Sequence, residues 1–195
     1  MRLFERLPDR IEIEGKRYRL KTDFRNVLKM LYILENEHIL PIARDWLALK
    51  CVMKRPPKDS RKALSEVKRF LFGESRSSNE KRMTSFEQDA DLIRAAFMQE
   101  YGINLYLDRL HWFEFTAFLH GLPNGNRYTE ILGIRARPVP APNKWNREER
   151  EALIRAKAAC ALTMNEEEQE KSYSRSLQRV FEDMKNITRG RGGNA

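Results

Sequence analysis

The stretch IRAAFMQEYGINLYLDRLHWFEFTAFLHGLP, residues 93–123, joins two short helical patterns that are dense in aromatic side chains. Four apolar residues of the first pattern share one helical face: Ile93, Ala96, Phe97 and Tyr101. The second pattern has its own apolar face, which three further aromatics widen almost all round: Leu110, Phe113, Leu119 and Leu122, with Trp112, Phe115 and Phe118. A helix this apolar must be buried on several sides. The stretch contains no set of groups that could run a reaction, so it favours a packing or binding protein.

The aromatic helix within this stretch has two compatible interpretations. It forms a plain core if its own domain supplies enough neighbours to bury it. It forms a binding surface if it leaves a groove that a partner's amphipathic helix can fill. Its candidate partner-binding residues are Trp112, Phe115 and Phe118.

Length and composition predict a protein with one well-buried core and a charged surface. The chain has 195 residues, of which 41% are hydrophobic and 33% are charged. No run approaches the roughly 20 apolar residues that a bilayer span needs. The start, MRLFERLPDR, lacks the apolar segment of a signal peptide. We therefore expect a cytoplasmic protein without a membrane partner.

The net charge of +9 is concentrated in one region. Residues 54–82 carry ten Lys or Arg against four acids, a local net of +6. On the outer side of the helix expected there lie Arg61, Lys62, Lys68 and Arg69. This face is either solvated or meets an acidic protein partner or a nucleic acid. Nucleic acid is the least favoured, because no aromatics interleave with the basic residues and no helix-turn-helix pattern precedes them.

The N-terminal half is expected to form a hairpin and three helices. Residues 11–20 alternate apolar and polar side chains around Glu14-Gly15, which predicts a β-hairpin. Thr22 or Asp23 caps a first helix that runs to about Asn36. Residues 39–53 predict a second helix, whose apolar residues at helical spacing are Ile42, Trp46, Leu49 and Met53. Asp59 or Ser60 caps the third helix, and residues 73–85 are expected to be a loop.

Three more helices complete the expected core. Residues 86–89 begin the fourth helix, which Gly102 closes. Residues 110–122 form the fifth, and Asn126 caps a sixth that ends near Arg137. The sequence therefore predicts a mainly α fold, a bundle of about six helices with a small N-terminal β-hairpin. The predicted core domain is residues 1–137.

A C-terminal arm is expected beyond this core. The prolines of residues 138–145 predict a stiff hinge, so few contacts should fix the direction of the arm, residues 146–195. The arm begins with an amphipathic, Ala-rich helix at 146–164 and ends in a tail expected to be disordered. Between them lies a short heptad seam, the candidate for self-association: Tyr173, Leu177, Val180, Met184 and Ile187.

The sequence offers no assembled catalytic or metal site. His111 and Glu114 share a helical face, but one such pair does not make a carboxylate-bridged metal centre. We expect His111 to be a partly buried polar partner at the aromatic cluster. Cys51 and Cys160 lie in apolar helical contexts typical of buried thiols. We therefore expect no catalytic residue, no metal ligand and no cofactor.

Several short motifs resemble one known family. They are Asp23-Phe24-Arg25, Asp89-x-Asp91, Ala96-Phe97, Tyr101-Gly102-Ile103, Leu110-His111-Trp112 with Phe115, Leu119 and Gly121-Leu122, and Ile134-Arg135. Over residues 20–140 the chain resembles the bacteriophage gene-product-fifteen family of small proteins from tailed phages and prophages. The resemblance implies a place in the tail-morphogenesis gene cluster, near the tail assembly chaperones. It implies no catalytic residue.

The resemblance and the residue patterns together predict a non-enzymatic phage tail assembly factor, similar to a tail assembly chaperone. Its expected partner is the tape-measure protein or the tail-tube protein, which it would hold soluble in the host cytoplasm until polymerisation. A homo-oligomer is possible through the arm. The alternatives are a structural tail or neck component of the virion and a weak basic nucleic-acid-binding protein. An enzyme is the least favoured class.

Overall fold

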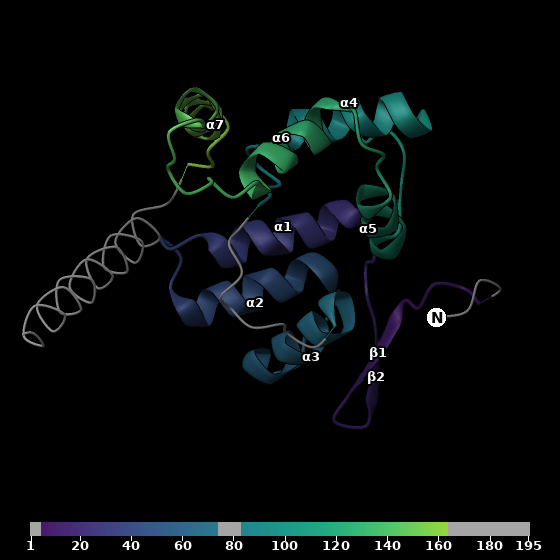
Figure 1. Cartoon of the computed structure of the whole chain (residues 1–195). Helices are drawn as coiled ribbons and strands as arrows, with labels where there is room; N and C mark the ends of the chain where they lie inside the picture. The colour runs from purple at the N-terminus through teal and green to yellow at the C-terminus, as the bar shows by residue number, and fades with distance from the viewer. Residues whose placement is uncertain (1–4, 74–82, 164–195) are drawn as a thin grey trace, which may run out of the picture.

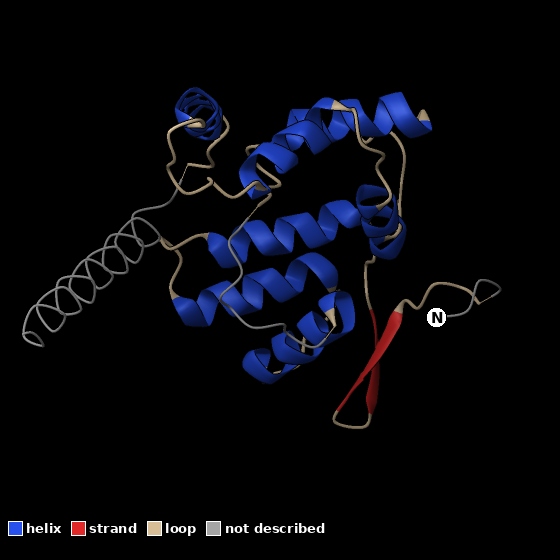
Figure 2. Cartoon of the chain, viewed as in Figure 1, coloured by secondary structure: helices blue, strands red, loops and turns tan. Residues whose placement is uncertain are grey.

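The fold is mainly α-helical, as predicted (Figures 1 and 2). A computed structural model describes residues 5–73 and 83–163. Within these ranges the strands are β1 (Arg10–Ile13) and β2 (Lys16–Arg19). The helices are α1 (Phe24–Glu35), α2 (Pro41–Val52), α3 (Ser60–Phe72), α4 (Ala90–Tyr101), α5 (Trp112–His120), α6 (Arg127–Ala136) and α7 (Arg147–Ala159).

The N-terminal hairpin packs on a helix. β1 and β2 are antiparallel, with Ile13 opposite Lys16 across the turn. Glu14 and Gly15 both have positive φ, +51° and +72°, which is the conformation of a tight two-residue hairpin turn. The alternation buries Ile11 and Ile13 against α3 and leaves the neighbouring side chains in water. The predicted hairpin is thus confirmed.

Helices α1, α2 and α3 pack one after another. The Asp23 carboxylate caps α1 by accepting from the Arg25 amide, at 3.0 Å. The buried side chains along these three helices include Val27, Met30, Leu49 and Val67, each fully covered. Because these residues recur at helical spacing, each helix turns one stripe toward a shared core.

The second helix exposes two residues that its periodicity suggested as inward-facing. Ile42 is 90% exposed and Trp46 is 46% exposed, whereas Ala48, Leu49 and Val52 are buried. Ile42 lies two turns before Leu49 on the same side of the helix. The expectation is wrong for Ile42 and Trp46 because the core covers only the C-terminal half of α2.

The segment that leads into α5 lies against the segment that leads into α1. The Trp112 amide donates to the Thr22 carbonyl at 2.7 Å, and the Phe24 amide donates to the Leu110 carbonyl at 3.1 Å. These bonds pair the entry segments of α1 and α5 antiparallel, with Asp23 opposite His111. The aromatic face of α5 is thereby held over the first turn of α1, although the two segments are far apart in the sequence.

Helix α7, the first part of the predicted arm, is docked on the core beside α6 (Figure 1). Leu153 is buried, and the Lys157 ammonium donates to the Arg135 carbonyl at 2.7 Å. Arg137 and Glu149 form an ion pair at 2.7 Å. Polar bonds and one buried apolar side chain thus hold α7 beside α6. The separation of the arm from the core stays a prediction.

The described chain ends against the start of α4. The Thr163 amide donates to the Gln88 side-chain oxygen at 2.7 Å, and the Gln88 amide group donates back to the Thr163 carbonyl at 3.0 Å. The seam residues Tyr173, Leu177, Val180, Met184 and Ile187, and the expected disordered tail, lie outside the described residues. Their association stays a prediction.

Candidate binding site

An aromatic stack links α1, α4 and α5. The Phe115 ring lies between Phe24, at 4.6 Å between centroids and 9° from parallel, and Phe97, at 5.3 Å and 21°. Trp112 packs on the Phe115 ring at 5.8 Å, and its indole N–H donates to the Leu71 carbonyl at 2.9 Å. Offset stacking with a satisfied indole N–H adds to the free energy of area burial. The stack is a rigid wall.

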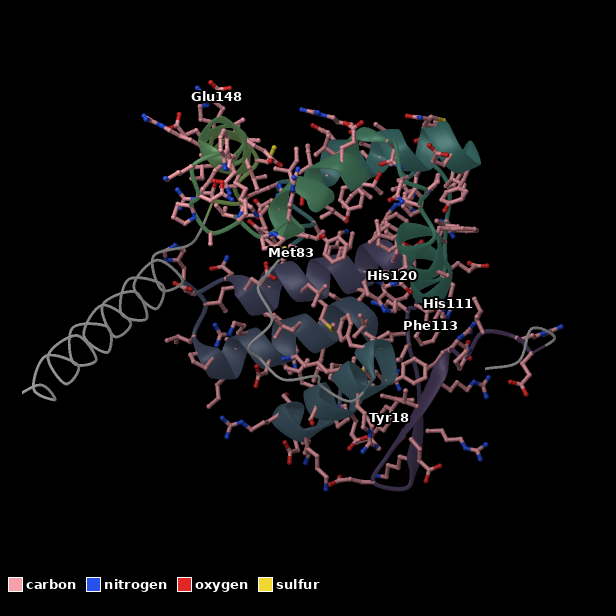
Figure 3. The ribbon with its side chains drawn as sticks, viewed as in Figure 1. Tyr18, Met83, His111, Phe113, His120 and Glu148 are labelled. Carbon is pink, nitrogen blue, oxygen red and sulfur yellow. The ribbon has the colours of Figure 1, made fainter. Side chains whose placement is uncertain are left out.

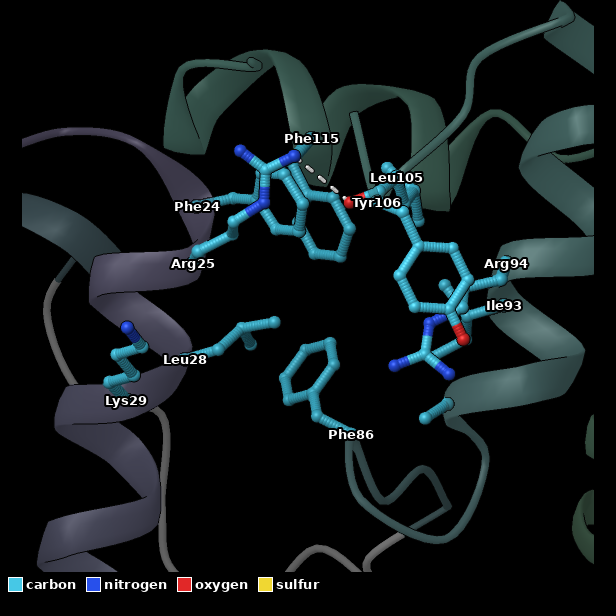
Figure 4. A pocket seen from close by; sticks show the side chains of 11 residues that line it. Phe24, Arg25, Leu28, Lys29, Phe86, Ile93, Arg94, Leu105, Tyr106 and Phe115 are labelled. Atoms are coloured by element: carbon cyan, nitrogen blue, oxygen red, sulfur yellow. Dashed lines mark hydrogen bonds between the residues drawn. The ribbon is translucent and has the colours of Figure 1, made fainter. Parts of the chain in front are cut away.

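A pocket of about 310 Å³ opens beside this stack, between α1 and α4 (Figure 4). Its apolar wall is formed by Phe24, Leu28, Phe86, Ala90, Ile93, Leu105 and Phe115. Around it lie three cations and one phenol: Arg25, Lys29, Arg94 and Tyr106. We call this hollow the α1–α4 pocket. Its volume is at the lower end of the range of binding pockets, so it suits one or two bulky side chains.

Two of the three cations, Arg25 and Arg94, contact the connection between α4 and α5. The Arg25 guanidinium donates to the carbonyls of Leu105, at 3.1 Å, and Asp108, at 2.6 Å. The Arg94 guanidinium lies 4.4 Å from the centre of the Tyr106 ring, a cation–π contact. Charged groups that lie over an apolar hollow attract acidic partners toward it.

The surface next to the pocket is also apolar. Tyr106 is 67% exposed and the following Leu107 is 76% exposed. Met98, one turn after Arg94 on α4, exposes about half of its side chain. Large apolar side chains that gather beside an open pocket are typical of an interaction surface.

The predicted basic residues are exposed on α3 and do not line this pocket. Arg61, Lys62, Lys68 and Arg69 all lie on the outer face of that helix. Lys62 reaches Glu14 of the hairpin turn at 2.8 Å, and this hydrogen bond raises the pKa of the ammonium. Arg69 pairs with Glu66. The structure therefore separates the basic face from the aromatic site, and a role for it in binding stays a prediction.

The three predicted aromatic residues have different positions. Phe115 forms part of the pocket wall. Trp112 is 2% exposed and belongs to the core. Phe118 is half-buried against Tyr101, whose hydroxyl donates to the Phe118 carbonyl at 2.9 Å. Of the three residues, only Phe115 lines the α1–α4 pocket, and at 1% exposure it is a buried part of the wall.

Sequence reasoning missed most of the pocket residues. Phe86 and Tyr106 lie in connections between helices, where periodicity carries no information about which side is buried. A usable signal was present in residues 103–107, INLYL, because large apolar residues are unusual in an exposed connection. Arg25 and Lys29 are one helical turn apart. These two cations, taken together with the apolar connection, could have indicated the site.

His111 caps a helix. Its Nδ1 accepts from the Phe113 amide at 3.2 Å, while the Glu114 carboxylate accepts from the His111 amide at 2.9 Å. This reciprocal arrangement is a capping box at the start of α5. His111 and His120 lie at opposite ends of α5 (Figure 3). In residues 5–73 and 83–163 no three metal-binding side chains lie close enough together to hold an ion.

A second hollow, of about 570 Å³, lies where the hairpin meets the starts of α1 and α5. Four cations lie around it: Arg19, Lys21, Lys54 and Arg109. Asp9 pairs with Arg19 at 2.8 Å, and the Lys21 ammonium donates to the Lys50 carbonyl at 3.3 Å. Internal partners thus already use part of this charge.

The protein is mainly α-helical and has an apolar hollow flanked by cations. The family model described as Bacteriophage Gp15 protein matches residues 3–162, and the chain belongs to this family. Comparison with curated proteins and with solved structures gives no match. Within the described part of the chain, each helix is too short or too polar to cross a membrane.

The motifs that carried the resemblance meet in space. Asp23 of the first motif lies opposite His111 of the Leu-His-Trp motif. Asp89 and Arg135, which lie in two other motifs, form a buried ion pair at 2.8 Å. Gly102 closes α4 in the left-handed conformation, at φ +66°. These motif residues therefore hold the core together and place the walls of the pocket.

Proposed function

We propose that this protein is a non-enzymatic tail assembly factor of tailed phages, which binds an amphipathic helix of the tape-measure or tail-tube protein through the α1–α4 pocket. Family membership supports a phage structural or morphogenesis protein. The observation that carries the finer proposal is the pocket itself, an open apolar hollow with Arg25, Lys29 and Arg94 around it.

Binding would follow the helix-in-groove mode. A client helix inserts one bulky side chain between Leu28 and Phe86, against the Phe115 ring, and lays its flanking apolar residues on Tyr106 and Leu107. Burying one such side chain contributes about 1.5–3 kcal/mol. Acidic residues beside the anchor would face the cations around the pocket. Such an interaction is weak enough to reverse, as holding a client until polymerisation requires.

The proposal is tested by co-expressing the protein with the tape-measure and tail-tube proteins of the same phage. Leu28→Asp places a charge in the pocket wall and should abolish co-purification. Ile42→Asp is the matched control, because Ile42 is 90% exposed on α2 and does not line the pocket. Equal client recovery with both variants would exclude the pocket as the binding site. If the unmodified protein retains neither client at low salt, the assembly-factor proposal fails.

A structural tail or neck component is the second candidate. It is favoured by exposed apolar side chains outside the pocket, above all Ile42 and Trp145, the latter 94% exposed. A permanent virion protein would cover these residues in its assembly. Mass spectrometry of purified virions decides between the two, because an assembly factor should be absent or far below the stoichiometry of the tail-tube protein.

A further inference from the structure

The described chain leaves the core next to the α1–α4 pocket. Thr163 and Gln88 exchange two hydrogen bonds, of 2.7 and 3.0 Å. Gln88 lies between Phe86 and Ala90 in the sequence, and both of these residues line the pocket. The described chain therefore ends against a segment that contributes two residues to the pocket lining.

Residues 164–195 have a sequence that complements the pocket. They begin with an acidic cluster, Glu166, Glu167, Glu168 and Glu170. The heptad seam follows: Tyr173, Leu177, Val180, Met184 and Ile187. The pocket is complementary to this segment, because it has cations beside an apolar hollow. Lys171 directly follows these four acids, so the cluster with this neighbour still carries a net negative charge.

We propose that the α1–α4 pocket binds the chain's own C-terminal segment, with an apolar side chain of the seam in the hollow and the acidic cluster facing Arg25, Lys29 and Arg94. The proposed occupant of the pocket in the free protein is thus a segment of the same chain. This inference concerns the free protein, so it stands whether or not the pocket also takes a tail protein.

The length of the connection permits the contact. Tyr173 is ten positions after Thr163, and an extended chain over ten positions spans up to about 33 Å. A tethered segment has an effective concentration on the order of millimolar, so even a weak intrinsic affinity is enough to keep the pocket filled. The hollow of about 310 Å³ has room for one or two side chains, which agrees with one anchor and not with burial of the whole seam.

The charges near the pocket do not all favour the acidic cluster. Arg94 already pairs with Asp91 at 2.7 Å, and Arg25 pairs with Asp23 at 3.5 Å. Asp91 is 94% exposed and contributes negative charge on the same helix as Arg94. Lys29, exposed on α1, is therefore the cation whose reversal should matter most for docking of the cluster.

The direct test is a photo-reactive residue at position 28 in the full-length chain, with the cross-linked peptides identified by mass spectrometry. We expect cross-links from position 28 to peptides within residues 173–187. The same group at position 42, exposed on α2 and outside the pocket, is the control and should not reach that segment. Cross-links to the rest of the chain only, or equal yields from both positions, would overturn the proposal.

Mixing isotope-labelled and unlabelled chains separates cis from trans occupation. Cross-linked peptides should carry a single label, because the segment and the pocket belong to one molecule. Mixed labels at the frequency of random pairing would mean that a second copy supplies the segment, and the cis proposal would be wrong.

Charge reversal gives a test that does not disturb the core. Lys29→Glu should speed tryptic cleavage after Lys171 and Arg175 by about tenfold, which corresponds to about 1.4 kcal/mol of lost docking. Arg61→Glu, an exposed cation on α3 away from the pocket, is matched in charge and should leave the cleavage rate unchanged. Equal effects of the two variants would attribute the change to overall charge and refute the proposal. Because none of these experiments contains a client protein, their failure would leave the proposed function to its own test.

Discussion

Arg135 donates two parallel hydrogen bonds to Asp89, from Nη1 to Oδ2 at 2.8 Å and from Nη2 to Oδ1 at 2.9 Å. The Asp89 side chain is 2% exposed and that of Arg135 is 10% exposed. Arg135 also donates to the carbonyls of Met83, at 3.0 Å, and Cys160, at 2.6 Å. The bonds with Asp89 raise the pKa of Arg135. One guanidinium therefore joins α6, the start of α4 and the end of α7.

Removing either partner of this pair should strongly destabilise the protein. Asp89→Ala and Arg135→Ala each leave a buried charge without its partner, and each is expected to lower the free energy of unfolding by about 3–5 kcal/mol. The double variant should lose less than the sum, because the second change removes the stranded charge. Urea unfolding of the four proteins measures the coupling. Strict additivity would contradict the prediction.

The exposed ion pair on α7 provides the control. Arg147 and Glu151 lie 2.9 Å apart with most of the arginine side chain in water. Arg147→Ala should change the free energy of unfolding by no more than about 0.5 kcal/mol, because water screens such a pair.

Trp112→Ala should be among the most damaging single changes. The substitution empties the space behind the Phe115 ring and leaves the Leu71 carbonyl without its indole donor. Truncation of a buried Trp costs about 3–5 kcal/mol. Trp145→Ala is the matched control, because Trp145 is almost fully exposed and its loss should leave the melting temperature unchanged. Equal melting temperatures for the two variants would show that Trp112 is not part of the stable core.

Local features of the fold were predictable from the sequence. At the start of a helix, the side chains of Asp23, Asp59 and Asn126 each accept a hydrogen bond from a backbone amide. Asp and Asn are preferred at this position. Gly102 ends α4 in the left-handed conformation that glycine adopts without strain. Each of these features depends on a few neighbouring residues, and the same holds for the turn at Glu14-Gly15. The information for them is therefore contained in a short window.

Features that depend on distant residues were not predictable. Asp89 and Arg135 are 46 positions apart, and nothing in either window indicates the other. The exposure of Ile42 depends on how far the neighbouring helices extend along α2, which periodicity does not report. The α1–α4 pocket combines two helices with two connections, so its lining could not be assembled before the fold was known. The docking of α7 likewise depends on the position of the Arg135 carbonyl.

Two glycines should respond in opposite directions to the same substitution. Gly102→Ala forces a side chain into a left-handed conformation, at φ +66°, and should cost about 1 kcal/mol or slightly more. Gly133→Ala, inside α6 with open space around its Cβ, should stabilise by about 0.5–1 kcal/mol. Thermal unfolding of both variants measures the difference. Stabilisation by Gly102→Ala would show that α4 does not end as described.

The pH dependence of Cys51 alkylation should show the effect of burial on its thiol. Burial raises the pKa of this thiol, and the nearby cations Lys29 and Lys21 only partly oppose the shift. The folded chain therefore holds less thiolate than the unfolded chain at a given pH. Peptide-resolved alkylation of Cys51 should accelerate more than tenfold between pH 8 and 10, because a thiol at the ordinary pKa of 9.0 accelerates about tenfold over that interval.

The same shift has a consequence for stability. A group with a raised pKa in the folded state stabilises the fold fully below its unfolded pKa, and this contribution is lost as the pH rises through the folded value. The free energy of unfolding should therefore fall above about pH 9. Cys51→Ser should make this fall smaller, and the other titrating groups then determine the pH dependence that remains. The urea-unfolded chain is the reference for the alkylation profile. If folded and unfolded chains show the same acceleration between pH 8 and 10, then Cys51 is not shielded by the packing of α2, and the buried-thiol interpretation is refuted.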